Sequence, residues 1–78
     1  MPTARSDLMC EVIGLSYDFD KRRGRLKMAP FGSCDMSGLI ALFTKIDPNV
    51  QWIETFAGDS PDGLYRRGPD GWDSVVIR

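Results

Sequence analysis

The stretch DMSGLIALFTKIDP, residues 35–48, decides the fold class. Apolar residues recur in it at intervals of three and four, which puts them on one face of a helix; they are Met36, Leu39, Ile40, Phe43 and Ile46. Ser33 or Asp35 can cap the start of this helix, and Pro48 disfavours helical backbone at Asp47, where we expect the helix to end. A helix of about three turns is not stable alone in water. Its apolar face must therefore cover a sheet.

Before the helix, the sequence predicts a β-hairpin. Residues 11–19 and 25–28 alternate between apolar and polar side chains, which is typical of strands with one buried face. A loop over residues 21–24 would give a register that matches apolar with apolar and acid with base. The predicted pairs are Phe19 with Leu26, Tyr17 with Met28, Asp20 with Arg25 and Asp18 with Lys27.

After the helix, three more strands are expected. Residues 49–58 predict a strand with Val50, Trp52 and Phe56 on one face and Ile53 on the other. The segment DSPDG, residues 59–63, is typical of a loop, LYRR of a short strand, GPDG of a tight turn, and WDSVVIR of a final strand. Loop length leaves open whether Arg66 or Arg67 faces Asp73.

This order, β-β-α-β-β-β, predicts an α+β fold, an antiparallel sheet with one amphipathic helix packed on one face. Residues 10–78 form the single domain and residues 1–9 a flexible lead-in. The sheet face away from the helix would hold Cys10, Val12, Ile53 and Val76, which is too apolar for a solvated face. Either the sheet curls or another chain covers it, so a homodimer or a partner-binding face is a hypothesis.

Composition excludes several chemistries. The 78 residues carry a net charge of −1 and contain no histidine, which removes Ser-His-Asp and Cys-His catalysis and histidine metal sites. Two cysteines cannot complete a tetrahedral zinc site. We therefore predict no enzyme, no catalytic, metal or cofactor-binding residues, and no cofactor. Without a signal-like or membrane-spanning apolar run, we expect no membrane association, a cytoplasmic location and reduced thiols at Cys10 and Cys34.

The segment FAGDSPDG, residues 56–63, resembles the Gly-Asp-Ser block of the GDSL-type hydrolases. The resemblance implies that Ser60 is a nucleophile. That family also needs a catalytic histidine, and this chain has none. Asp59 and Asp62 could instead hold a divalent cation, because hard cations bind carboxylates. The simpler interpretation of this segment is a turn-rich loop.

Half of the ten basic residues lie between positions 21 and 27: Lys21, Arg22, Arg23, Arg25 and Lys27. Such a cluster can grip phosphates, so a nucleic-acid-binding hairpin is one hypothesis. In the predicted register, however, Arg25 and Lys27 already face aspartates, which leaves only the three cations of the turn free. The mildly acidic chain also differs from dedicated DNA-binding domains, which are strongly basic. Nucleic acid is therefore the less favoured partner.

The C-terminal half holds the residue types that dominate binding hot spots. Arg66, Arg67 and Trp72 are candidate partner-binding residues, together with the acidic Asp59 and Asp62, whose loop could imitate phosphate charge. The favoured function is therefore a small non-enzymatic module that binds another protein. Small, acidic, single-domain chains of this kind are common among phage and mobile-element products that inhibit or regulate larger complexes. That comparison rests on analogy and on no motif.

Overall fold

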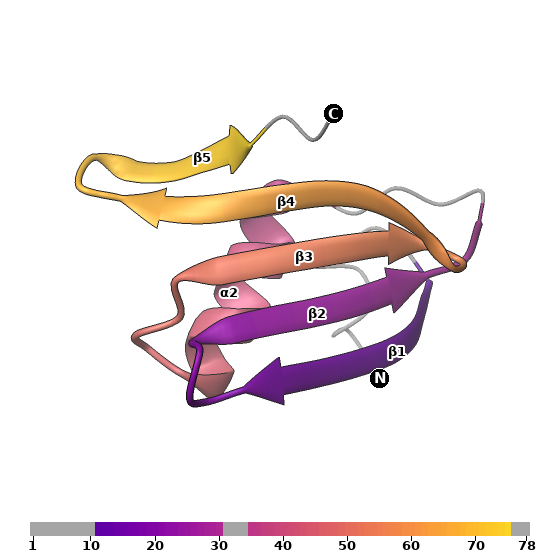
Figure 1. Ribbon diagram of the computed structural model, residues 1–78, viewed down its shortest axis with the longest axis horizontal. Coiled ribbons are helices and arrows are strands. Elements are labelled where there is room, and N and C mark those ends of the chain that lie inside the picture. The colour runs from indigo at the N-terminus through magenta and orange to yellow at the C-terminus, as the bar shows by residue number, and fades with distance from the viewer. Residues whose placement is uncertain (1–10, 31–34, 76–78) are drawn as a thin grey trace, which may run out of the picture.

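A computed structural model describes residues 11–30 and 35–75, which form a five-stranded sheet and one helix (Figure 1). The elements are β1 (Val12–Asp18), β2 (Arg23–Met28), α2 (Met36–Ile46), β3 (Trp52–Ala57), β4 (Ser60–Gly68) and β5 (Gly71–Val75). The strands lie in sequence order, β1-β2-β3-β4-β5. The predicted α+β class is confirmed. The lead-in 1–9, and the expectations for Cys10, Ser33, Cys34 and Val76, lie outside the described residues.

The expectation of a wholly antiparallel sheet is wrong at one position. β2 and β3 are parallel neighbours, and the other three strand pairs are antiparallel. Parallel neighbours need a long crossover, and α2 with its flanking segments supplies it. The helix therefore returns the chain to the same end of the sheet, and β2 and β3 both become interior strands.

The helix follows its sequence pattern, except that Met36, expected on the apolar face, is 39% exposed. The Asp35 carboxylate accepts a hydrogen bond from the Gly38 amide at 3.1 Å, and the Asp47 amide donates to the Phe43 carbonyl at 2.9 Å. These bonds satisfy backbone groups that a helix end otherwise leaves unpaired. Asp35 is one of the two caps that the sequence offered, and the end before Pro48 is as predicted.

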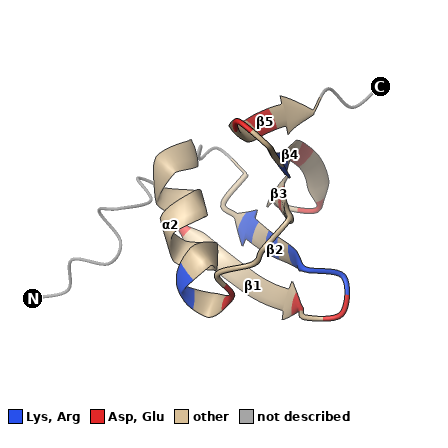
Figure 2. Ribbon diagram, turned by 90° about the vertical axis from the view of Figure 1, so that its left-hand side faces the viewer, with Lys and Arg blue, Asp and Glu red and all other residues tan. Residues whose placement is uncertain are grey.

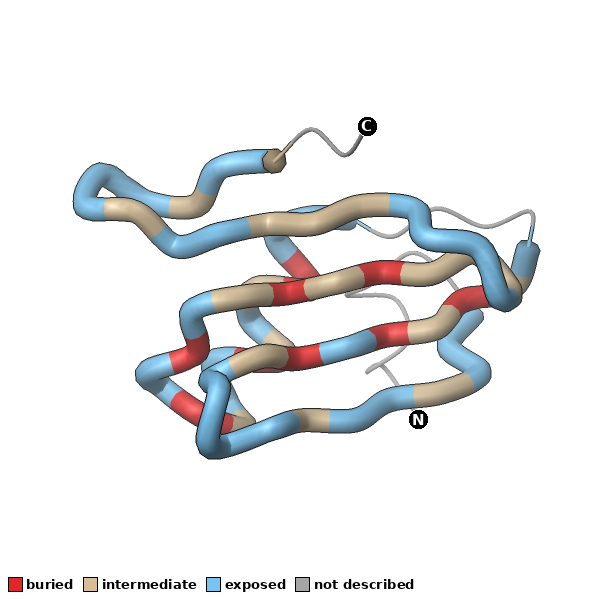
Figure 3. Tube along the Cα trace, in the orientation of Figure 1, coloured by how far each residue is buried: buried red, intermediate tan, exposed pale blue. Residues whose placement is uncertain are grey.

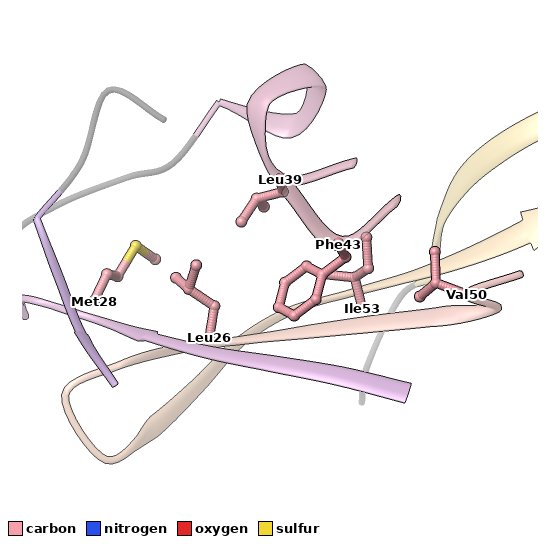
Figure 4. Close-up of a cluster of buried hydrophobic side chains, with 6 residues drawn as sticks. All are labelled: Leu26, Met28, Leu39, Phe43, Val50 and Ile53. Atoms are coloured by element: carbon pink, nitrogen blue, oxygen red, sulfur yellow. The ribbon is translucent and has the colours of Figure 1, made fainter. Parts of the chain in front are cut away.

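The core lies between α2 and the sheet. Its fully buried apolar side chains come from the helix, from β2, from β3 and from the segment before β3 (Figure 4): Leu26, Met28, Leu39, Phe43, Val50 and Ile53. Burial is concentrated in these central elements, whereas β1 and β5 are largely exposed or half-buried (Figure 3). The edges of the sheet therefore contribute little to the core.

The predicted hairpin register is wrong. β1 pairs with β2 so that Leu15 is opposite Leu26, Tyr17 opposite Gly24 and Asp18 opposite Arg23, and the turn spans residues 19–22. The Asp18 side chain accepts hydrogen bonds from the amides of two turn residues, at 2.9 and 3.2 Å. This local capping competes with cross-strand ion pairing. Phe19 consequently lies in the turn, 59% exposed, and not in the core.

The faces of β3 are also the reverse of the expected ones. Ile53 is buried in the core, whereas Trp52 and Phe56 are half-buried on the opposite face. Residues paired across adjacent strands share a face, and Ile53 is paired with Gly24 beneath the helix. Val50 is buried too, but in the segment before β3.

The chain after β3 contains less loop than predicted. Of residues 59–63, only Asp59 lies in the turn, together with Gly58 at φ +63°; the remainder belong to the nine-residue β4. The pairing of β3 with β4 shifts register between Thr55 and Phe56, where Asp62 is the extra residue in β4. The turn expected at residues 68–71 is present, with Gly71 at φ +128°.

Candidate functional site

The face of the sheet away from α2, called the open face below, gathers charged and aromatic side chains. Strand alternation and register place them there: Arg23, Arg25 and Lys27 on β2, Trp52, Glu54 and Phe56 on β3, Leu64 and Arg66 on β4, and Asp73 on β5. Figure 2 shows α2 on the other side of the sheet, so within the described residues no helix covers this face. The open face is thus the surface available for contact.

The cations of β2 are held by carboxylates from the β3 side of the sheet. Glu54 Oε1 lies 3.2 Å from Arg25 Nε and 3.9 Å from Arg23 Nε, and Lys27 Nζ lies 2.9 Å from Asp59 Oδ1. The hydrogen bond from Lys27 lowers the pKa of the Asp59 carboxyl. The predicted partners of Arg25 and Lys27, Asp20 and Asp18, are therefore wrong. Arg25 and Lys27 are each paired with an acid as expected, but with Glu54 and Asp59, and Arg23 shares Glu54 with Arg25.

Trp52 and Arg66 form a second feature of the open face. They are cross-strand partners, and Arg66 Cζ lies 5.9 Å from the centroid of the Trp52 ring, within cation–π range. Arg66 also lies opposite Asp73 on β5, which answers the question of which arginine faces that aspartate. A half-buried aromatic ring under an arginine is the kind of anchor that binding surfaces use.

Over β1, β2 and the end of β3, the open face has a hollow of about 400 Å³. Gly14 and Ser16 on β1 lie opposite Lys27 and Arg25, and their small size leaves the space open. Phe56 also lines the hollow. The hollow therefore combines an aromatic wall with two cationic side chains and with the Asp59 carboxylate, which is paired with Lys27.

The predicted trio of Arg66, Arg67 and Trp72 does not share a surface. Arg67 donates hydrogen bonds to the carbonyls of Pro48 and Val50, at 2.9 and 3.3 Å. Trp72 lies opposite Arg67 and packs against the core. Arg67 thus ties β4 to the segment between α2 and β3, and only Arg66 reaches the open face.

The basic residues of the turn also differ in their surroundings. Arg22 has a left-handed backbone, φ 54°, and its guanidinium lies 2.9 Å from the carboxylate of Asp47, which is only 4% exposed. Tyr17 donates to the same carboxylate oxygen at 2.6 Å. The Tyr17 hydrogen bond, reinforced by Arg22 and the Asn49 amide, lowers the pKa of Asp47 to about 2. Lys21 remains in the exposed turn.

Two acidic candidates also have local contacts. Asp59 is bound by Lys27, and Asp62 accepts a long hydrogen bond from the Thr55 hydroxyl at 3.4 Å. The described residues contain no group of three or more acids, cysteines or histidines that could hold a metal ion. Nor do they contain a helix that is long and apolar enough to cross a membrane.

Comparisons of the chain with models of protein families, with curated proteins and with solved structures found no match. The sequence predicted Trp52 and Phe56 on one face of β3, but not that the face points away from the helix or that Glu54 contributes to it. Their alternation along β3 was visible in the sequence. The sequence does not show which elements β3 packs against, so it does not show which face of the strand is buried.

Proposed function

We propose that this chain is a non-enzymatic module that binds another protein through its open face. It would regulate that partner by occupying the partner's binding surface. The observation that carries the proposal is the Trp52–Arg66 pair, with the hollow at Phe56 four residues further along β3, on a face that no described helix covers. Tryptophan and arginine are over-represented among the few residues that supply most of the binding energy at protein interfaces.

The charges of the open face indicate what kind of partner it accepts. Arg25 and Lys27 line the hollow, yet each already has a carboxylate partner. A partner carboxylate must compete with Glu54 or Asp59, so charge supplies orientation and specificity more than affinity. The partner surface that fits best presents an apolar side chain to Phe56 and a carboxylate nearby.

The first prediction is that reversing one charge on the open face abolishes partner capture. A photo-crosslinking amino acid at Leu64, on the open face, should give a defined adduct with the partner in a lysate of the native host. Adding Arg25→Glu should remove that adduct, because the new carboxylate lies beside Glu54 and repels an acidic partner. Gel electrophoresis and mass spectrometry measure the adduct.

Lys45→Glu is the matched control, since it makes the same charge change on an exposed position of α2. It should leave the Leu64 adduct intact, and circular dichroism should show that both variants are folded. Equal adduct yield from Arg25→Glu and from the unmodified sequence would count against binding at the open face.

One observation favours a second candidate function, binding of single-stranded nucleic acid. Trp52 and Phe56 lie opposite Arg23 and Lys27 of β2 on one sheet face, and sheets that combine aromatic rings with cations stack bases on those rings. The carboxylates that hold the cations oppose this function, because phosphates would meet Glu54 and Asp59 as well. In this second candidate function the nucleic acid would bind the open face, and not the hairpin turn that the sequence suggested.

Fluorescence anisotropy with a labelled oligonucleotide separates the two functions. Nucleic-acid binding should weaken steeply as salt is raised, because phosphate contacts release counterions. Binding at low salt that Trp52→Ala removes would favour the second candidate. No anisotropy change at low salt would eliminate it and leave the protein-binding proposal.

A further inference from the structure

One line of cross-strand partners on the open face, called the Trp52 row below, has an arginine on each side of a tryptophan. Register places two arginines beside the ring and two aspartates beyond them; in order across the strands these are Asp18, Arg23, Trp52, Arg66 and Asp73. Side chains opposite each other on adjacent strands are close enough to interact. By register alone, two acids would neutralise the two bases.

Both aspartates of the Trp52 row point elsewhere. Asp18 Oδ1 accepts hydrogen bonds from the backbone amides of Asp20 and Lys21, at 2.9 and 3.2 Å. Asp73 Oδ2 lies over Gly68, 3.3 Å from the position that a Cβ atom on that glycine would take. Among the residues that the structure describes, neither carboxylate forms an ion pair. The acids of the row therefore do not neutralise its arginines.

The two arginines consequently keep hydrogen-bond donors free. Arg23 Nε lies 3.9 Å from Glu54 Oε1, which is beyond hydrogen-bond distance. In the described part of the chain Arg66 forms no ion pair and no side-chain hydrogen bond, and its printed contact is the stack over Trp52. A guanidinium that stacks on a ring still presents its N–H groups at its edge. The row thus offers two unoccupied guanidinium groups beside one half-buried ring.

The other end of the open face differs in this respect. Arg25 and Lys27 hold carboxylates of the chain itself, at 3.2 and 2.9 Å. An incoming carboxylate at Phe56 must displace one of these acids, whereas one at the Trp52 row displaces none. The two ends are four residues apart along β3, about 13 Å. Recognition of acidic groups therefore belongs to the Trp52 end and apolar contact to the Phe56 end.

We propose that the Trp52 row is a carboxylate-binding subsite and that the partner of the open face is a protein with an acidic segment, which places one carboxylate on Arg66 and another on Arg23. This inference rests on the proposed function and names the chemistry of its partner. A planar guanidinium binds a carboxylate through two parallel hydrogen bonds. The ring beneath Arg66 fixes the plane of that fork, so less freedom is lost on binding.

The surrounding acids favour separate carboxylates over the backbone of a nucleic acid. Asp18 and Asp73 lie at the outer ends of the row, and Glu54 lies one row further along. A nucleic-acid strand carries a phosphate at every nucleotide and would bring negative charge past these acids. An acidic protein segment can place its carboxylates over the arginines alone. The row therefore suits an acidic protein segment better than a polyphosphate chain.

The second prediction is that peptides selected for binding to the wild-type chain are acidic. A random peptide library displayed on phage is the probe, and the enriched sequences should share at least two Asp or Glu residues together with an apolar residue. Fluorescence anisotropy of a labelled selected peptide gives its Kd. Enriched sequences that lack acidic residues, or a selection without enrichment, would overturn the inference.

A double-mutant cycle tests direct contact between Arg66 and the peptide. Arg66→Gln should raise the peptide Kd about tenfold or more, because charge-assisted hydrogen bonds are lost. Changing the contacting acid of the peptide to its amide should do the same, and both changes together should cost little more than either one. Arg66→Lys should recover only part, since lysine keeps the charge without the fork. Additive losses for every acid of the peptide would contradict the contact.

Two control pairs separate the Trp52 row from net charge. Lys45→Gln removes one positive charge from an exposed position of α2 and should leave the peptide Kd unchanged. Asp73→Asn should lower the Kd by about threefold, because a competing carboxylate beside Arg66 is removed. Asp70→Asn, in the exposed turn, should change it less. Equal effects within either pair would show that overall charge, and not the row, sets the affinity.

The Leu64 adduct distinguishes failure of this inference from failure of the proposed function. Arg66→Gln should reduce the adduct with the host partner, as Arg25→Glu does. An adduct that survives Arg66→Gln but not Arg25→Glu would keep the protein-binding function and overturn the carboxylate subsite. Loss of every adduct in the wild-type chain would overturn both. An oligonucleotide that binds through Arg66 while no peptide is selected would assign the row to phosphates and overturn the inference as well.

Discussion

Gly24 is the residue whose size the fold constrains most tightly. A Cβ atom built on it would lie 2.4 Å from two carbon atoms of the Phe43 ring. Phe43 is fully buried and anchors α2 on β2, so the ring has no room to retreat. The glycine in the sequence Arg-Gly-Arg therefore serves the packing of helix on sheet. The sequence alone suggested that it serves the turn.

The third prediction is that Gly24→Ala destabilises the protein by about 1–3 kcal/mol, the usual cost of overpacking a core. Urea denaturation followed by circular dichroism gives the difference in the free energy of unfolding. Phe43→Leu in the same chain should recover part of the loss, because the shorter side chain vacates the contested space.

Gly14→Ala provides the comparison. Its Cβ would lie 3.4 Å from the Lys27 Cβ, an ordinary contact. This variant should change stability far less than Gly24→Ala. If the two substitutions were equally disruptive, the contact with Phe43 would not be the cause.

Asp47 makes stability depend on acid. The hydrogen bond from Tyr17, together with Arg22 and the Asn49 amide, lowers its pKa from 3.8 to about 2 in spite of burial, which acts in the opposite direction. At pH values between about 2 and 3.8, Asp47 binds more protons in the unfolded chain than in the folded one. The stabilisation from Asp47 is therefore complete above about pH 4 and is lost as the pH falls toward 2.

Tyr17 makes the matching contribution at high pH. Burial, followed by the hydrogen bond to Asp47 and its charge, raises the pKa of Tyr17 to about 12. Its neutral form is thus favoured by folding. That stabilisation is present below about pH 10 and is lost as the pH rises from 10 toward 12.

The fourth prediction is that Asp47→Asn lowers the melting temperature at neutral pH and flattens its dependence on pH between 4 and 2. The amide can still accept from Tyr17, but it carries no charge for Arg22 and no proton to gain. Thermal unfolding at a series of pH values measures this slope. Asp70→Asn, at an exposed turn position, should retain the wild-type slope. An unchanged slope for Asp47→Asn would show that other carboxyls govern acid unfolding.

At the scale of elements, the sequence predicted the end of α2 and left its start open between Ser33 and Asp35, of which Asp35 is the cap. The information is local: apolar spacing, a capping aspartate and a proline after the end. The β1–β2 hairpin was predicted as an element but with the wrong register. There the Asp18 carboxylate caps the turn, and acids outside the hairpin satisfy Arg25 and Lys27.

The fifth prediction concerns the cap of α2. Asp35→Ala removes the acceptor for the Gly38 amide and should cost about 1 kcal/mol of stability, as is typical when an N-cap is lost. Asp35→Asn should retain most of it, because the side-chain oxygen remains. The free energies of unfolding of the two variants, measured by chemical denaturation, test this difference. Equal losses for alanine and asparagine would argue that the carboxylate charge, and not the capping bond, stabilises the helix.

At the scale of the whole molecule, the parallel β2–β3 contact explains most of the differences between expectation and structure. It places Ile53 beneath the helix and turns Trp52 outward. It also brings Glu54 beside the arginines of β2. The candidate site therefore exists only because two strands separated by a helix are neighbours, which no local pattern specifies.

The sequence by itself determined the α+β class, the capped helix and the turn at residues 68–71, because spacing and turn chemistry act between residues close in the chain. The tertiary structure alone decided the hairpin register, the outward faces of β3 and β4 and, with them, that Arg66 and not Arg67 lies on the open face. These follow from competition among distant partners for the same strand edges and charges. In that competition, burial of Ile53 and Phe43 outweighs the cross-strand ion pairs that the local pattern favoured.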